Sequence, residues 1–262
     1  KNDLSRWLRA QSLYHLASIL KPITMKSDGS DAEKTRELIY TTIKSYRKER
    51  TRGSIAEFNR KSYDETFLFT RIGKGSLGGK GRGLAFIAME MKADGIGKRY
   101  KDVYVSIPRT VVISTELFDR FLALNDFWPG DFVDKKDDEI LSIFLSAKLP
   151  EDLELDLKRI VEVIRVPISV RSSSLLEDSH FQPFQTSMIP NKGSDEKRLE
   201  DLENAVKTVW ASTYFEGARE YLKRTGHSTE EEKMAVIIQQ ITGSDHDGLW
   251  FPNISGVARS LD

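Results

Sequence analysis

The sequence predicts an α/β layered domain, of α+β character, that follows a helical segment. Three observations carry this prediction. Apolar residues recur at helical spacing through the first sixty residues, strands alternate with helices from about residue 66, and the 262 residues are 39% hydrophobic and 31% charged. A chain of this length and composition buries a proper core. We divide it into a helical N-terminal segment, residues 1–62, and a layered domain, residues 63–262.

The composition excludes several classes of function. Forty basic side chains balance forty acidic ones, so the net charge gives no sign of a nucleic-acid partner or of a membrane surface. The absence of cysteine excludes disulfides, thiolate nucleophiles and sulfur-ligated zinc, and it fits a reducing compartment such as the cytoplasm. No apolar run approaches the roughly 20 residues of a membrane span. Both ends of the chain look cut, and we expect it to be part of a longer protein.

The N-terminal segment is expected to hold two helices. Apolar residues from Leu4 to Leu20 keep to one helical face, and Pro22 follows the end of that helix. A capping box formed by Ser30 and Glu33 opens the second helix.

The layered domain is expected to contain strands and helices in turn. In order, the elements are a strand at 67–73, a helix at 84–92, a strand at 104–114, a helix capped by Ser114 or Thr115, helices at 137–149 and 151–164 separated by Pro150, a strand at 168–170, a helix at about 195–224 and a strand at 234–242.

A glycine-rich loop joins the first strand of this domain to the first helix. It packs six glycines between Gly73 and Gly83. It is not a dinucleotide fingerprint, because no acidic strand end follows about 20 residues on, and it is not a Walker loop, because Gly81 follows Lys80. Converging N–H groups, a helix N-terminus and the lysines at 74 and 80 nevertheless suit phosphate. The alternative is a flexible turn whose glycines only permit a tight chain reversal.

A second motif ends the strand at 168–170. Arg171 and the serines that follow it, Ser172 to Ser174, offer a forked guanidinium and several hydroxyls to phosphate oxygens. Glu177 and Asp178 either reach a magnesium ion or hold Arg171 in an ion pair. The alternative is therefore an ion-paired arginine in front of a serine-capped helix.

Four segments of the domain, in order, resemble the nucleotide-binding domain of the phosphoenolpyruvate synthase / pyruvate phosphate dikinase family. They are LGGKGRGLA, VVISTELFDRFL, SVRSSSLLEDS and AVIIQQITGSDHDGLWFPNISGVARS, and together they extend the resemblance over roughly residues 66–262. The helical residues 1–60 resemble linkers that join a sensory or receiver module to the kinase domain in some bacterial relatives.

The resemblance implies the N-terminal part of an ATP-grasp-like domain that binds ATP and Mg²⁺. In this family the β phosphate of ATP passes to a histidine on a swivelling domain and then to pyruvate, giving phosphoenolpyruvate, AMP and phosphate. The phosphohistidine and pyruvate-binding domains are then expected in cis, and a homodimer stays open. By motif, Arg171 is the catalytic residue and the ATP-binding residues are Gly78, Gly79, Lys80, Gly81, Arg171, Ser172, Ser173 and Gln239, with Gln240 as the alternative to Gln239. Arg219 matches a family arginine whose role stays open.

The sequence departs from the family pattern after Asp178. The family's glycine-containing loop is absent, since no glycine lies between Ser179 and Asn191. Either the protein lacks a lid over the phosphates or, as we favour, a stretch after Phe184 is missing from the sequence. No metal ligand can be assigned, and Mg²⁺ ligands are expected beyond residue 262.

The four histidines are expected to be structural or exposed, because none lies in a phosphohistidine context; they are His15, His180, His227 and His246. This part alone is therefore expected to be inactive. Two other functions stay open, a dikinase for another acceptor such as a glucan or a drug, and a regulatory module with a degenerate ATP site.

Overall fold

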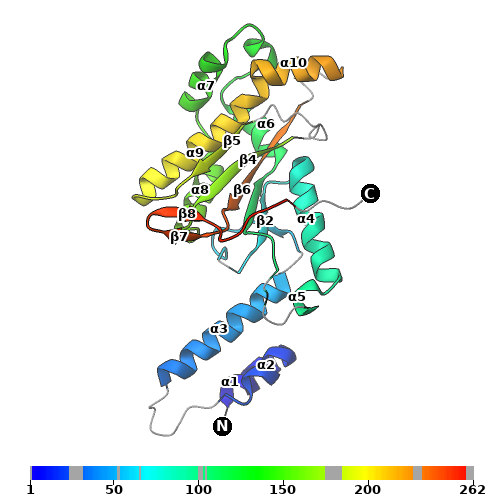
Figure 1. Ribbon diagram of the computed structural model, residues 1–262, viewed down its shortest axis with the longest axis vertical. Helices are drawn as coiled ribbons and strands as arrows, with labels where there is room; N and C mark the ends of the chain where they lie inside the picture. The colour runs from blue at the N-terminus through cyan, green and yellow to red at the C-terminus, as the bar shows by residue number, and fades with distance from the viewer. Residues whose placement is uncertain are drawn as a thin grey trace. The chain divides into compact units, whose positions relative to one another are not determined.

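The computed structural model divides the chain into two compact units, residues 1–52 and 53–262 (Figure 1). The division lies ten residues before the boundary drawn from the sequence, 62/63. Ser30 of the expected capping box lies outside the described residues, and so do Glu177 and Asp178. The structure describes residues 2–23, 32–51, 54–64, 66–99, 103, 105–174, 185–226 and 232–257.

The described residues of the first unit form three helices, α1 (Asp3–Ala10), α2 (Tyr14–Leu20) and α3 (Ala32–Thr51). The single helix expected between Leu4 and Leu20 is therefore wrong, because the chain turns between α1 and α2. Asn2 joins the start of α1 to the end of α2: its Oδ1 accepts from the Ser5 amide at 3.0 Å and its Nδ2 donates to the Leu20 carbonyl at 2.6 Å. The buried residues of this unit include Leu8, Leu16, Ala17 and Leu20.

In its described residues, the second unit is built on a six-stranded mixed sheet. Its strand order is β1-β2-β3-β6-β4-β5. The central strand β6 reads MAVIIQQ, and its continuous apolar run from Met234 to Ile238 is typical of a strand that is buried on both faces. The strands are β1 (Ala56–Glu57), β2 (Phe69–Ile72), β3 (Thr110–Ile113), β4 (Ile168–Ser174), β5 (Thr186–Ile189) and β6 (Met234–Gln240), and a separate hairpin is formed by β7 (Ser244–His246) and β8 (Leu249–Phe251).

Helices cover both faces of this sheet (Figure 1). On one face α6, α7, α8 and α9 enclose the larger core, which includes Val111, Ile113, Val170 and Val236. On the other face α4 covers a smaller core with Phe69, Val112, Ala235 and Ile237. The helices are α4 (Gly78–Ala93), α5 (Ile96–Arg99), α6 (Thr115–Leu124), α7 (Asp137–Ser146), α8 (Glu151–Val163), α9 (Asp195–Ala211) and α10 (Glu216–Thr225), with 3₁₀ turns at Pro129–Phe132 (η1) and Ser212–Tyr214 (η2). None of the described helices is long and apolar enough to cross a membrane.

Strand directions place three strand ends at one edge of the sheet. β2 runs parallel to β3, while β6 is antiparallel to both β3 and β4. The carboxyl ends of β2, β3 and β4 therefore meet at the same edge. In register, Ile113 lies beside Val236, which lies beside Ser172. At this edge the glycine loop follows β2, and the arginine–serine motif forms the end of β4.

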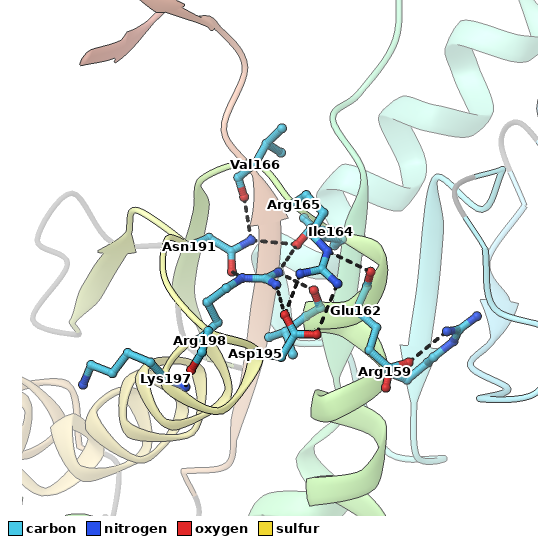
Figure 2. A network of polar contacts seen from close by, with 11 residues as sticks. Arg159, Glu162, Ile164, Arg165, Val166, Asn191, Asp195, Lys197 and Arg198 are labelled. Carbon is cyan, nitrogen blue, oxygen red and sulfur yellow. Dashed lines mark hydrogen bonds and ion pairs between the residues drawn. The ribbon is translucent and has the colours of Figure 1, made fainter. Parts of the chain in front are cut away.

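A buried arginine network supports the opposite, amino end of β4 (Figure 2). Arg198 is 2% exposed and donates to the carbonyls of Ile164 and Val161, to Asn191 Oδ1 and to Asp195 Oδ1. Asn191 has a φ of 57°, a conformation that asparagine tolerates, and its Nδ2 donates to the Ile164 carbonyl at 2.7 Å. The network therefore ties α9 and the end of β5 to the chain that leads into β4.

Several expected elements have different limits in the structure. The helix predicted from residue 84 begins at Gly78, and the strand predicted at 104–114 is confined to Thr110–Ile113. The helix predicted at 195–224 is interrupted by the 3₁₀ turn at Ser212–Tyr214. A short strand at 56–57 pairs with β2 in a segment that was expected to be helical.

Candidate functional site

The candidate site lies beyond the carboxyl ends of β2, β3 and β4. The glycine loop leaves β2 here, Ser114 to Glu116 follow β3, and Arg171 to Ser174 end β4. In open α/β sheets, ligands bind outside the carboxyl ends of parallel strands. The topology therefore brings together at this edge two motifs that lie far apart in the sequence.

The glycine loop and the arginine–serine motif are in direct contact. Gly78 has a φ of +71°, and a Cβ on this residue would overlap the carbonyl group of Ser173. The Ser173 hydroxyl is fully buried, donates to the Leu77 carbonyl at 2.7 Å and accepts from the Gly81 amide at 3.0 Å. Ser173 thus fixes the start of α4 on β4.

Lys80 reaches the same motif from the first turn of α4. Its Nζ donates to the Ser172 carbonyl at 3.3 Å and to the Ser172 hydroxyl at 3.4 Å. The lysine is half-buried, and Gly79 beside it is also half-buried. An ammonium group is therefore held beside the main chain that carries Arg171.

Arg171 projects from the face of the sheet that α4 covers. Its neighbours in register are Ile237, which belongs to the core under α4, and Thr186 on β5. The side chain is half-buried, and it forms no hydrogen bond or ion pair with any other residue that the structure describes. Since Glu177 and Asp178 lie outside those residues, the expected ion pair with them is not tested.

Gln239 lies on the same face of β6, two residues from the register partner of Arg171. Its Nε2 donates to Thr110 Oγ1 at 2.9 Å, and its carbonyl accepts from Ser169 Oγ at 3.4 Å. Gln240 is half-buried and its amide donates to the Arg109 carbonyl. The Gln239 side chain is thus part of a buried polar row that crosses β3, β6 and β4.

The sequence did not identify Ser114, Thr115 and Glu116 as partners of the glycine loop. The Lys74 amide donates to Glu116 Oε2 at 2.6 Å, the Gly75 amide to Ser114 Oγ at 3.3 Å and the Ser76 amide to Thr115 Oγ1 at 3.0 Å. Ser114 occupies the N-cap position of α6, as expected, but its side chain makes no capping bond to that helix. These three loop amides therefore face the protein and are not available to phosphate.

In the described part of the chain, the guanidinium of Arg219 donates hydrogen bonds to main-chain carbonyls. Its Nη1 donates to the carbonyls of Phe132 at 2.7 Å and Tyr214 at 2.8 Å, and both terminal nitrogens reach the Lys135 carbonyl at 3.2 Å. The guanidinium thereby joins α10 to the segment before α7. This set of carbonyl partners accounts for an arginine at this position.

Two of the four histidines lie in the described residues. His15 lies beside the Tyr46 ring, and His246 stacks on Phe251 and contacts Ser244 Oγ through its Nε2 at 3.0 Å. Throughout the described ranges, no group of three or more His, Asp or Glu side chains is placed to hold a metal ion. His180 and His227 lie outside those ranges.

Comparison with known proteins identifies the family of this fold. The family model for the pyruvate phosphate dikinase AMP/ATP-binding domain matches residues 74–262. The match includes Lys80, Arg171 and the whole of β6. No curated protein gives a significant match to the chain.

Proposed function

The chain belongs to the pyruvate phosphate dikinase AMP/ATP-binding domain family, and from that premise we propose that the edge formed by β2, β3 and β4 binds the phosphates of ATP. The observation that supports this most directly is the meeting of two cationic motifs. Lys80 contacts Ser172, and the residue that precedes Ser172 in β4 is Arg171, whose guanidinium has no partner among the described residues. A lysine and a forked arginine suit an anion with several phosphates.

The reaction that we propose for the protein is that of a phosphoenolpyruvate synthase. ATP, pyruvate and water give AMP, phosphoenolpyruvate and phosphate, and the β phosphoryl group travels on a histidine of another domain. Phosphoryl transfer needs charge neutralisation and in-line positioning more than covalent help. Lys80 and Arg171 would neutralise the charge of the phosphates and position them. Ser173 and the close approach of Gly78 would hold α4 against β4 and thereby keep the two cations next to each other.

Magnesium is part of this proposal. Mg²⁺ would neutralise the charge of the ATP phosphates, and its ligands would lie beyond residue 262. The acceptor histidine and the pyruvate site would likewise lie on further domains in cis. Lys80, Arg171 and the first turn of α4 would hold the phosphates on the nucleotide side of the transfer.

Titration with Mg-ATP tests this function. We expect clear binding by a longer protein that includes the further domains, and weak binding by the 262-residue chain. In the longer protein, Lys80→Ala and Arg171→Ala should each weaken binding by about 10- to 100-fold, as expected for one charge-assisted contact. Lys92→Ala, at the exposed last turn of the same helix, is the matched control for Lys80 and should bind as the wild type does.

The products distinguish the proposed reaction from its alternatives. Formation of AMP that depends on pyruvate supports the synthase, whereas AMP formation that needs a glucan or a drug indicates a dikinase for another acceptor. Binding of ATP without AMP formation indicates a regulatory module. A longer protein that does not bind ATP contradicts the proposal.

A further inference from the structure

We propose that Glu116 is a positioning residue for the nucleotide: its carboxylate holds the glycine loop on the end of β3 and thereby fixes the turn of α4 that carries Lys80. The identity of the ligand in this inference rests on the proposed function. The positioning itself rests on contacts between the loop and the segment Ser114–Glu116, which we call the loop clamp.

The first contact joins the loop to a charged group. Glu116 Oε2 accepts from the Lys74 amide at 2.6 Å, a bond between residues 42 positions apart. A hydrogen bond to an ionised carboxylate is stronger than one between neutral groups. Glu116 is the second residue of α6, where the helix dipole favours a negative charge. The carboxylate is therefore stabilised where it meets the loop.

Two hydroxyls extend the clamp along the loop. Ser114 Oγ and Thr115 Oγ1 accept from the next two amides, those of Gly75 and Ser76. In return the Thr115 amide donates to the Ser76 carbonyl at 3.0 Å. Three successive side chains thus satisfy three successive loop amides, which fixes the path of the loop.

The first two glycines of the loop permit this docking. A Cβ on Gly73, whose φ is +80°, would overlap Ser114 Oγ and a methyl group of Leu117. A Cβ on Gly75 would lie 2.6 Å from the Glu116 amide nitrogen and 2.7 Å from Thr115 Oγ1. These glycines are required for close packing against the clamp. The approach of a phosphate is not needed to explain them.

The clamp acts on the site through the short connection to α4. One residue, Leu77, separates Ser76 from the first residue of the helix, Gly78. Ser173 holds Leu77 and Gly81 on β4 from the other side. The first turn is therefore pinned to β3 through the loop and to β4 directly. Loss of the Glu116 carboxylate should loosen one of these two attachments and let Lys80 shift, while the core under α4 remains.

The experiment compares three variants of the longer protein. Glu116→Ala removes the acceptor, Glu116→Gln keeps an acceptor oxygen at that position, and Glu90→Ala, on the exposed side of α4, is the control. Amide hydrogen exchange at residues 74–76, Kd for Mg-ATP and the melting temperature are measured for each. For Glu116→Ala we expect exchange at residues 74–76 and Kd to rise about tenfold, with little change in melting temperature. Glu116→Gln should restore most of both, and Glu90→Ala should change neither.

The outcomes separate this inference from the proposed function. If the wild type does not bind ATP, the proposed function fails and the nucleotide role of Glu116 fails with it. If the wild type binds and Glu116→Ala binds equally well, only the positioning role is overturned. Unchanged amide exchange in Glu116→Ala overturns the clamp itself, whatever the affinity for ATP.

Discussion

Gly78 and Ser173 lie so close together that no side chain fits between them. The Cβ of an alanine at position 78 would overlap the Ser173 carbonyl, and the φ of +71° adds strain for any residue other than glycine. We expect Gly78→Ala to lower the free energy of unfolding by roughly 2–4 kcal/mol. Chemical denaturation of the variant measures this change.

Gly83 is the matched control for Gly78. It lies in the same helix, and a Cβ there would meet no atom within 4 Å. Gly83→Ala should raise the free energy of unfolding by about 0.5–1 kcal/mol, because alanine loses less entropy in a helix. Equal destabilisation by both substitutions would show that α4 tolerates no alanine at all and that the contact with Ser173 is not the cause.

Arg198 should contribute more to stability than its neighbour Arg165, although both pair with Asp195. Arg198→Met would remove the donor that Arg198 supplies to Asn191 Oδ1 and to the Val161 carbonyl, and it would leave the buried Ile164 carbonyl with Asn191 Nδ2 in place of two side-chain donors (Figure 2). We expect a loss of about 3–5 kcal/mol in the free energy of unfolding.

Arg165→Ala provides the comparison for Arg198→Met. Its bidentate pair with Asp195, at 2.5 and 3.2 Å, is exposed, and exposed pairs contribute little to stability. Urea denaturation of the two variants should therefore give very different midpoints. Similar midpoints would contradict the assignment of the buried network as the support of β4.

Arg219 should be replaceable by lysine only with a loss of stability. Its guanidinium donates to carbonyls of Phe132, Tyr214 and Lys135 at once, and a lysine ammonium cannot reproduce this planar fork. Arg219→Lys is expected to cost about 1–3 kcal/mol in the free energy of unfolding. Arg224→Lys, in the same helix and 80% exposed, is the control and should change little. A loss of nucleotide affinity in Arg219→Lys at unchanged stability would reject the structural role.

Asp156 should make stability depend on pH. Burial raises the pKa of this carboxyl from 3.8 to about 6, although Arg60 lies 3.1 Å away and opposes the shift. As the pH rises, Asp156 therefore ionises in the unfolded chain before it ionises in the folded one. The stability that protonated Asp156 contributes below pH 3.8 is progressively lost as the pH rises to about 6.

Asp156→Asn removes this titration. The melting temperature of the wild type should therefore fall relative to that of the variant between about pH 4 and about pH 6 and stay parallel to it above that range. Thermal unfolding across that range measures the difference. A wild type that gains stability relative to the variant with rising pH would show that the ion pair with Arg60 outweighs burial.

The sequence was sufficient to predict the layered class and the order of most elements. The two motifs meet because each lies at the carboxyl end of a strand, and the topology places those ends at one edge. The start of α4 at Gly78 was missed because glycine is a poor helix former, and only the contact with Ser173 explains its presence there.

The loop clamp was also missed, for a different reason. Its hydrogen bonds join residues about forty positions apart, such as Lys74 and Glu116, and local patterns carry no sign of such partners. Ser114 follows a strand and precedes a helix, so its sequence context predicts a cap. The tertiary fold uses its hydroxyl for Gly75 instead. Likewise, the break at Ser212–Tyr214 lies inside the single helix predicted at about 195–224.

The placement of β6 has a consequence for synthesis of the protein on the ribosome. In the described sheet, β1, β2 and β3 share main-chain hydrogen bonds with β4 and β5 only through β6, which pairs with β3 on one side and β4 on the other. Lys80 and Arg171 are both translated before Met234. The nascent chain therefore carries both cations, yet it cannot complete the sheet that aligns them until β6 has emerged.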